Sequence, residues 1–275
     1  MKKCLVCLFL LYVAAVSSFG RFPGSRKVCN PEKAEDVLRI VAYNVGVFSK
    51  NYDSMQDIAR MVQEIGADAA ALCELDSCNR RHSSFQLEDF AEALGSEEEV
   101  WQYRFGSAMA WNGGSYGIGL VTASDMQDSF EIKLPKGDGH EPRVCVVAET
   151  TGYVIAAVHL DHRNEEVRME QARIVTERLK KLYRRSRKPV FLCGDFNAVP
   201  DSPTLQQLGK DWTVLSDTAP TYPAENSRKC IDYILALKNR AEYEVVKTEV
   251  CTELESADVR KTSDHLPVYV DLRIR

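Results

Sequence analysis

Four polar residues of the chain stand at points where an apolar, strand-like run gives way to a loop. They are Asn44, Glu74, His159 and Asp195. Polar side chains at the carboxyl ends of neighbouring strands meet at one rim of a sheet, where the sites of α/β proteins usually lie. Amide, carboxylate and imidazole groups in such a place favour a site for Mg²⁺, or for Mn²⁺, over a zinc site, since no cysteine pair has zinc-finger spacing.

Three short motifs carry further side chains of the same kind. They are Gly194-Asp195-Phe196-Asn197, Ile231-Asp232-Tyr233-Ile234 and Ser263-Asp264-His265-Leu266-Pro267-Val268. Each motif alone is weak evidence for a functional role, because Asp and Asn side chains often only cap backbone groups in turns. Their order and their shared position near strand ends favour chemistry instead. A hard cation held by one or two carboxylates leaves room for water and phosphate oxygens, as phosphoryl chemistry requires, and Glu74 is the first choice as its ligand.

The hydrophobic pattern predicts the elements that must position these residues. Short β-type runs alternate with amphipathic stretches, without an internal repeat, which is typical of one continuous α/β domain. Several strands are apolar on both faces, so we expect buried sheets with helices on their outer faces. The predicted strands are residues 38–44, 69–74, 117–122, 144–149, 153–159, 190–195, 231–237 and 266–274, and the predicted helices are residues 54–65, 85–94 and 164–184.

Composition and charge leave the substrate open. The chain has 275 residues, of which 45% are hydrophobic, enough for one large core. A formal net charge of −5 provides no global field that would attract nucleic acid, although a local cationic pocket is compatible with it. We interpret the basic cluster at residues 180–188 as a solvated helix end rather than as a surface that binds nucleic acid.

The N-terminus has the pattern of a secretory signal. Lys2 and Lys3 precede an apolar run at residues 4–16, and small residues follow it. The run is shorter than the roughly 20 residues that span a bilayer. We therefore expect a signal peptide at residues 1–20, a linker at 21–36 and the functional domain at 37–275, in a protein that is secreted or periplasmic and does not stay inserted in a membrane.

Seven of the nine cysteines remain once the signal is removed, an odd number that leaves at least one thiol unpaired. Cys73 and Cys193 lie in apolar runs, and we expect them to be buried hydrophobes. The candidates for disulfides are Cys29, Cys78, Cys230 and Cys251, and their pairing is open.

The ordered motifs resemble those of the endonuclease/exonuclease/phosphatase family, with its DNase I-like fold, and in particular its secreted bacterial members. The resemblance covers nearly all of the mature chain. It implies an α/β (α+β) four-layer sandwich, in which helices flank two packed, mainly antiparallel β-sheets. It also implies that Asn44, Glu74 and Asp264 hold the metal, and that the catalytic residues are His159, Asp195, Asn197, Asp232, Asp264 and His265.

The resemblance implies hydrolysis by in-line attack of water on phosphorus. His265 would act as general base or as hydrogen-bond donor to the phosphate, oriented by Asp264, and Asp195 would share the activation of water. Asn197 and His159 would bind the non-bridging oxygens and stabilise the charge that grows there. Asp161 would orient a histidine.

Substrate contacts are expected from Arg143 and Asn112, and Arg80, Arg81 and Arg163 are further candidates for phosphate contacts. A guanidinium fork at Arg143 suits phosphate, although a strand-start salt bridge is an alternative. Asn112, in the loop at residues 111–116, would shape the pocket, or the loop is only a glycine-rich turn. The favoured substrates are phosphodiesters of nucleic acid, and phospholipids, inositol phosphates and sugar phosphates are alternatives. A non-enzymatic binding protein is disfavoured by the complete motif set, and a monomer is expected.

Overall fold

The computed structural model describes residues 32–96 and 99–275. The expected signal peptide at 1–20, most of the expected linker and Cys29 lie outside the described residues. Within the described part, no helix is both long and apolar enough to cross a membrane.

In the described part of the chain, twelve strands form two six-stranded mixed sheets, which confirms the expected fold class. The first sheet has the order β11-β12-β1-β2-β4-β3, and the second has the order β5-β6-β7-β8-β10-β9. Only β1 with β2 and β7 with β8 are parallel neighbours; the other pairs are antiparallel. The first sheet contains β1 (Leu38–Asn44), β2 (Ala69–Ser77), β3 (Gln102–Trp111), β4 (Gly114–Thr122), β11 (Tyr243–Val250) and β12 (Val268–Ile274). The second contains β5 (Met126–Leu134), β6 (Arg143–Thr150), β7 (Val154–His159), β8 (Val190–Asp195), β9 (Trp212–Val214) and β10 (Asp232–Leu237).

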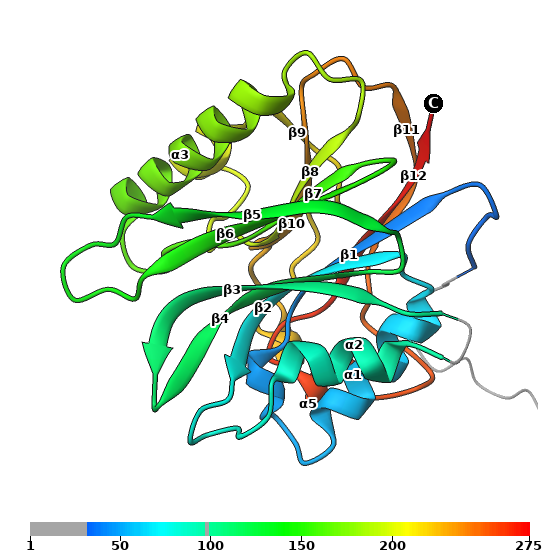
Figure 1. Cartoon of the computed structure of the whole chain (residues 1–275), viewed down its shortest axis with the longest axis vertical. Coiled ribbons are helices and arrows are strands. Elements are labelled where there is room, and N and C mark those ends of the chain that lie inside the picture. The colour runs from blue at the N-terminus through cyan, green and yellow to red at the C-terminus, as the bar shows by residue number, and fades with distance from the viewer. Residues whose placement is uncertain (1–31, 97–98) are drawn as a thin grey trace, which may run out of the picture.

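Helices cover the outer face of each sheet and complete four layers (Figure 1). On the side of the first sheet lie α1 (Ser54–Ile65), α2 (Gln86–Leu94) and α5 (Val259–Thr262), and on the side of the second lie α3 (Glu165–Tyr183) and α4 (Pro203–Leu208). Local signals set their ends. Gly66, in the left-handed region with φ 72°, ends α1, and the side chain of Asn164 accepts hydrogen bonds from the first turn of α3.

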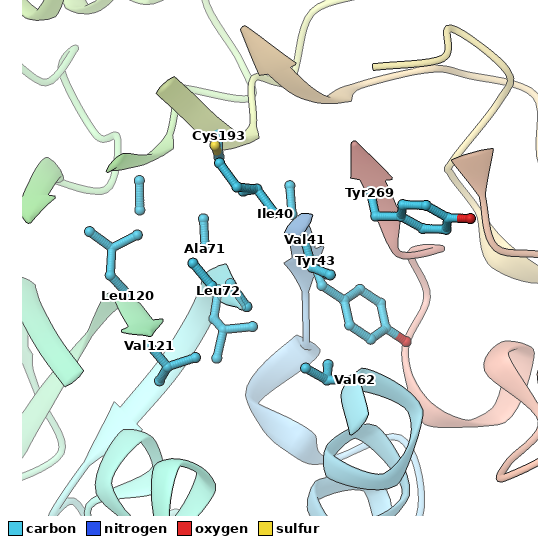
Figure 2. Packing of buried hydrophobic residues seen from close by; sticks show 14 of the residues in the cluster. Ile40, Val41, Tyr43, Val62, Ala71, Leu72, Leu120, Val121, Cys193 and Tyr269 are labelled. Atoms are coloured by element: carbon cyan, nitrogen blue, oxygen red, sulfur yellow. The ribbon is translucent and has the colours of Figure 1, made fainter. Parts of the chain in front are cut away.

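The core is built from strands whose two faces are both apolar. Along β1, Ile40 faces the second sheet, whereas Val41 faces α1, so that consecutive residues serve different layers (Figure 2). Cys193 of β8 reaches toward Ile40 from the second sheet, and Val62 of α1 packs beneath Val41. This double burial explains why the apolar runs in the sequence are nearly continuous.

The predicted strands are the central ones, and the four strands that the pattern missed are β3, β5, β9 and β11. These four are the edge strands of the two sheets. An edge strand is only partly covered, so its sequence mixes polar and apolar residues; β11, for example, buries only its last residue, Val250. Without an apolar run, such a strand has little signal in the sequence.

The cysteines form no disulfide at Cys78 or Cys230, which are both free thiols. The disulfide prediction for these two residues is therefore wrong. Cys73 and Cys193 are fully buried in the core between the sheets, as predicted. The thiol of Cys73 also contacts the carbonyl of Val158 at 3.2 Å, so β2 and β7 are joined by a polar contact within this core.

Two lysines of the basic cluster at the end of α3 are paired with acids of neighbouring segments. Nζ of Lys180 lies 2.6 Å from Oδ1 of Asp211, and Nζ of Lys188 lies 2.6 Å from Oε1 of Glu149. The other four basic residues of the cluster are exposed, which agrees with the interpretation as a solvated helix end.

Candidate active site

A cavity of about 640 Å³ collects most of the predicted site residues. Asn44 and Asp232 lie behind its wall and contact residues that line it. Asn112 is not among the lining residues: it is exposed in the turn between β3 and β4, with φ 47°. The predicted residues that line the cavity are Glu74, Arg143, His159, Asp195, Asn197, Asp264 and His265.

The register of the second sheet places three of the predicted site residues side by side. His159 at the end of β7 pairs with Asp195 at the end of β8, and Asp195 pairs with Asp232 at the start of β10. The first sheet supplies Asn44 and Glu74 from β1 and β2. The expectation that all converge on the rim of one sheet is therefore wrong, because the site is assembled from two sheets that face each other.

Glu74 lies in a β-bulge rather than at the end of its strand. The pairing of β2 with β4 shifts between Cys73 and Leu75, and Glu74 has φ 62°. The strand then continues to Ser77, three residues beyond the predicted end. A bulge re-aims a side chain, and here it directs the Glu74 carboxylate to the cavity.

The amide of Asn44 joins the two sheets at the site. Its Nδ2 donates to Oε1 of Glu74 at 3.0 Å and to Oδ2 of Asp195 at 3.2 Å, while its Oδ1 accepts from the backbone N–H of Gly46. Burial raises the pKa of Glu74, although the hydrogen bond from Asn44 opposes the shift. In this orientation Asn44 positions Glu74, and its own oxygen is engaged by the backbone.

His265 is held by Asp232, and not by Asp264 as expected. Its Nδ1 lies 2.9 Å from Oδ2 of Asp232, which also accepts from the hydroxyl of Thr221 at 2.5 Å. The ring of Tyr222 packs on the imidazole with 4.8 Å between centroids. Burial lowers the pKa of His265, but the charges of Asp232, Asp195 and Asp264 together raise it to about 10.

The Ser-Asp-His motif is anchored to the end of β1. The hydroxyl of Ser263 donates to the carbonyl of Asn44 at 2.6 Å and accepts from the backbone N–H of His265 at 3.2 Å. This tie brings His265, which precedes β12 of the first sheet, against Asp232 of the second. Asp264 remains at the cavity wall, close to Gly46.

Asp195 lies between the two histidines. Its Oδ2 is 3.5 Å from Nε2 of His159 and 3.7 Å from Nε2 of His265. Burial and the nearby charge of Asp232 raise the pKa of Asp195, and the N–H of Asn197, 2.8 Å from its Oδ1, opposes the shift. A carboxylate with a raised pKa is suited to exchange protons near neutral pH.

The glycine of the Gly-Asp-Phe-Asn motif is required by a close backbone approach. Gly194 has φ +132°, and a Cβ at this position would lie 2.1 Å from the carbonyl oxygen of Val158. Only glycine lets β8 lie this near to β7. The next residue, Asp195, is thereby fixed opposite His159.

Arg143, at the start of β6, reaches the same wall of the cavity. Its two terminal nitrogens lie 3.4 Å from Nδ1 of His159 and 3.3 Å from Nδ1 of His162, and one of them is 3.3 Å from Glu141. Its Nε has no hydrogen-bond partner among the described residues. Burial and the charge of Arg143 hold the pKa of His159 well below its usual range, so His159 is neutral.

Two sets of residues could hold a divalent cation. The set predicted from the sequence is Asn44, Glu74 and Asp264, whereas the side chains of Asp195, Asp232 and His265 also bring potential ligand atoms within 4.8 Å of one another. In the second set, Asp232 and His265 are already hydrogen-bonded to each other. Glu74 instead presents a desolvated carboxylate to the cavity with one amide as its hydrogen-bond partner. Hard oxygen donors of this kind fit Mg²⁺.

Two residues that support the site carry no signal in the sequence. Thr221 and Tyr222 support His265 from a loop far from any motif. Arg81, in the loop after β2, and Trp111, the last residue of β3, also line the cavity; Arg81 was a candidate phosphate contact, and Trp111 belongs to the loop expected to shape the pocket. Asp161 was expected to orient a histidine, and it does so, but its partner is His140, at 2.7 Å.

Solved structures of known proteins share this fold. A structure of an endonuclease/exonuclease/phosphatase family protein from Bacteroides thetaiotaomicron has a TM-score of 0.68 and 21% identity, and the match covers 86% of this chain and 94% of that one. A mannosyl-6-phosphatase from the same species has a TM-score of 0.68 and 22% identity over 86% of this chain and 99% of that one. The catalytic domain of human Nocturnin, with bound sulfate, has a TM-score of 0.63 and 19% identity, and the match covers 90% of this chain and 97% of that one.

The sequence itself matches one family model across most of its length. No curated protein matches the chain significantly. Residues 41–265 match the model described as the endonuclease/exonuclease/phosphatase family, and this segment contains every predicted site residue. The chain therefore belongs to the endonuclease/exonuclease/phosphatase family and is a hydrolase that acts on phosphoester bonds.

Proposed function

We propose that this protein is a Mg²⁺-dependent phosphoesterase that hydrolyses its substrate by in-line attack of water. The observation that carries the proposal is the meeting of Glu74, His159, Asp195 and His265, from two sheets, around one cavity. Carboxylates beside imidazoles at such a cavity can hold a cation and move a proton within one site.

The residues of the cavity wall fit a hard divalent cation. Glu74 would hold it, with Asn44 fixing the direction of the carboxylate and Asp264 as a further carboxylate at the wall. When bound, Mg²⁺, or Mn²⁺ in its place, supplies electrostatic stabilisation of the negative charge on the phosphate oxygens.

The pKa shifts of His265 and Asp195 assign different proton-transfer roles to these two residues. His265, with a pKa of about 10, is protonated at neutral pH and donates to a phosphate oxygen rather than accepting a proton from water. Asp195, whose pKa is raised, then accepts the proton that the attacking water loses. Neutral His159 can donate through Nε2, and Arg143 and Asn197 face the same cavity as phosphate contacts.

The substrate class expected from the sequence is a phosphodiester of nucleic acid, and a strand end or single nucleotide fits the geometry best. Arg81, Arg143 and Arg168 bring positive charge to the cavity wall, and each of them also contacts a carboxylate. A sugar phosphate is the second candidate, because the cavity has room for one phosphorylated ring and because a mannosyl-6-phosphatase shares the fold. We place the enzyme outside the cytoplasm, on the basis of the signal pattern at residues 1–20.

A substrate panel tests the proposal. Release of products from DNA, RNA, bis-4-nitrophenyl phosphate and hexose phosphates is measured with Mg²⁺, with Mn²⁺ and after chelation. We expect turnover that disappears on chelation and in Asp195→Asn, and persists in the control Asp201→Asn, at an exposed carboxylate outside the site. Turnover that survives both chelation and Asp195→Asn contradicts the proposal. Hydrolysis of hexose phosphates alone selects the second candidate.

A further inference from the structure

One wall of the cavity carries a cation and an aromatic ring that the proposed chemistry does not use. Arg81, in the loop after β2, and Trp111, at the end of β3, both line the cavity together with Glu74. The centre of the Arg81 guanidinium lies 6.0 Å from the centroid of the Trp111 ring. The wall thus combines a positive charge with a large flat surface next to the reacting end.

Arg81 is fixed in place by a buried carboxylate. Its Nε and Nη2 donate to the two oxygens of Asp76, at 2.7 Å and 2.9 Å, and Asp76 is fully buried. The ring of His82 also contacts Asp76, at 2.7 Å, so Arg81 is not the only partner of this carboxylate. Among the described residues, the hydrogen bonds of Arg81 come from Nε and Nη2 only, so the N–H donors of Nη1 remain for a ligand.

Trp111 is a large aromatic side chain that the fold leaves uncovered. Its exposed fraction is 40%, whereas the other two tryptophans, Trp101 and Trp212, are 7% and 1% exposed. Trp111 pairs with Gly114 across the turn of the β3–β4 hairpin. An exposed indole at a cavity wall is a surface on which a flat ring can stack.

The loop and the hairpin are joined, so this wall exists before a ligand arrives. The N–H of Arg80 donates to the carbonyl of Asn112 at 3.0 Å, and the amide of Asn79 donates to the carbonyl of Ser115 at 3.2 Å. Gly114 approaches so closely that a Cβ there would lie 2.3 Å from the carbonyl oxygen of Cys78. A preformed wall loses little entropy on binding.

We infer that Arg81 and Trp111 form a specificity subsite, which binds a ring and a second anionic group of the substrate, apart from the phosphate that is hydrolysed. The inference rests on the proposed function, since it takes the reacting phosphate to lie at Glu74 and Asp195. The shared chemistry is a ring stacked on Trp111 with an anion at Arg81. A nucleoside with two phosphates and a hexose with two phosphates both have this chemistry.

Tryptophan fluorescence of the metal-free, full-length protein tests the subsite without requiring turnover. The ligands are adenosine 3′,5′-bisphosphate, adenosine 5′-monophosphate, glucose 1,6-bisphosphate and glucose 6-phosphate. We expect saturable quenching by at least one bisphosphate, with an affinity about tenfold or more above that of its monophosphate, as for one charge-assisted contact. The bisphosphate that binds shows whether the ring stacked on Trp111 is a nucleobase or a sugar.

Variants assign the effect to the two residues. Arg81→Gln should bring the affinity for the bisphosphate down to that for the monophosphate, and Trp111→Phe should abolish the quenching signal. Arg80→Gln is the matched control and should bind like the wild type, because Arg80 is exposed and does not line the cavity.

The inference is overturned if neither bisphosphate quenches, or if mono- and bisphosphate bind equally well. It is likewise overturned if Arg80→Gln and Arg81→Gln behave alike. A failure of the proposed function has a different signature, namely normal quenching without any Mg²⁺-dependent release of phosphate in the substrate panel.

Discussion

Nδ1 of His265 lies 2.9 Å from Oδ2 of Asp232, and this contact joins the two sheets at the site. His265 precedes β12 of the first sheet, and Asp232 opens β10 of the second. The pair fixes the direction of the imidazole and keeps it charged, so the docking of the sheets also sets the protonation state of a catalytic group.

Replacing Asp232 with Asn should lower the pKa of His265. The carboxylate is the strongest influence that raises this pKa to about 10, and burial alone would lower it. If activity needs protonated His265, activity falls as the pH rises through that pKa, so the alkaline limb of the pH profile should move to lower pH in Asp232→Asn. The measurements are an NMR titration of the His265 ring and kcat/KM against pH. An unshifted His265 pKa would show that Asp232 does not govern its charge, and Asp217→Asn is the control at an exposed position away from the cavity wall.

The same pair should make stability depend on pH. The pKa of His265 is raised on folding from the model-peptide value of 6.5 to about 10, so the charged ring stabilises the fold fully below pH 6.5. This contribution should be lost as the pH rises toward 10. Urea unfolding of the metal-free protein across that window should show the decline in the wild type, and Asp232→Asn should show a smaller one. Equal slopes in both proteins would contradict the assignment.

Replacing Glu74 with Gln should weaken the response to Mg²⁺ by removing the desolvated charge that would hold the cation. We expect the Mg²⁺ concentration for half-maximal activity to rise about tenfold or more. Without metal, Glu74→Gln should be at least as stable as the wild type, because burial disfavours the ionised carboxylate. Activity titrated with Mg²⁺ checks the first point and thermal unfolding of the metal-free protein checks the second, with Glu166→Gln, an exposed position, as the control. An unchanged Mg²⁺ requirement would move the metal to other residues, with Asp195, Asp232 and His265 the first alternative.

Removing the carboxylate of Asp271 should destabilise the fold strongly. Nε of Arg39 lies 2.5 Å from Oδ1 of Asp271, and both side chains are almost fully buried. Asp271→Ala removes the carboxylate partner of a buried charge, and breaking a buried ion pair in this way typically costs about 3–5 kcal/mol. The ion pair of Asp36 and Arg273 is a matched surface control, and Asp36→Ala should change stability little because solvent screens it. Similar unfolding free energies for the two variants would show that the buried pair adds nothing beyond a surface pair.

Adding one methyl group at Gly194 should disturb the site. Its φ of +132° and the 2.1 Å approach to the Val158 carbonyl leave no room for a Cβ. Backbone strain of this kind typically costs about 1–3 kcal/mol, and Gly194→Ala should also lose activity because Asp195 is displaced. In Gly152→Ala the added Cβ meets no atom within 4 Å, and this control should keep both stability and activity. A fully active Gly194→Ala would show that β8 can move away from β7 at no cost.

The hydrophobic pattern was sufficient for the central strands and the main helices. Strand β1, strand β8 and helix α1 have the predicted bounds, because their apolar residues are buried on the faces that the pattern implies. The edge strands were not predictable in this way. Strand β11 is recognised only when its backbone pairs with β12, and this pairing depends on residues distant in the chain.

Motifs at strand ends were enough to name Glu74, His159, Asp195 and His265 as site residues, and all four line one cavity. The contacts that connect them follow only from the fold. The partner of His265 is Asp232, 33 residues away, rather than its neighbour Asp264, because a hydrogen bond depends on the docking of two sheets and not on proximity in the chain. The direction of the Glu74 side chain also depends on the fold, because it is set by a bulge in the pairing of β2 with β4.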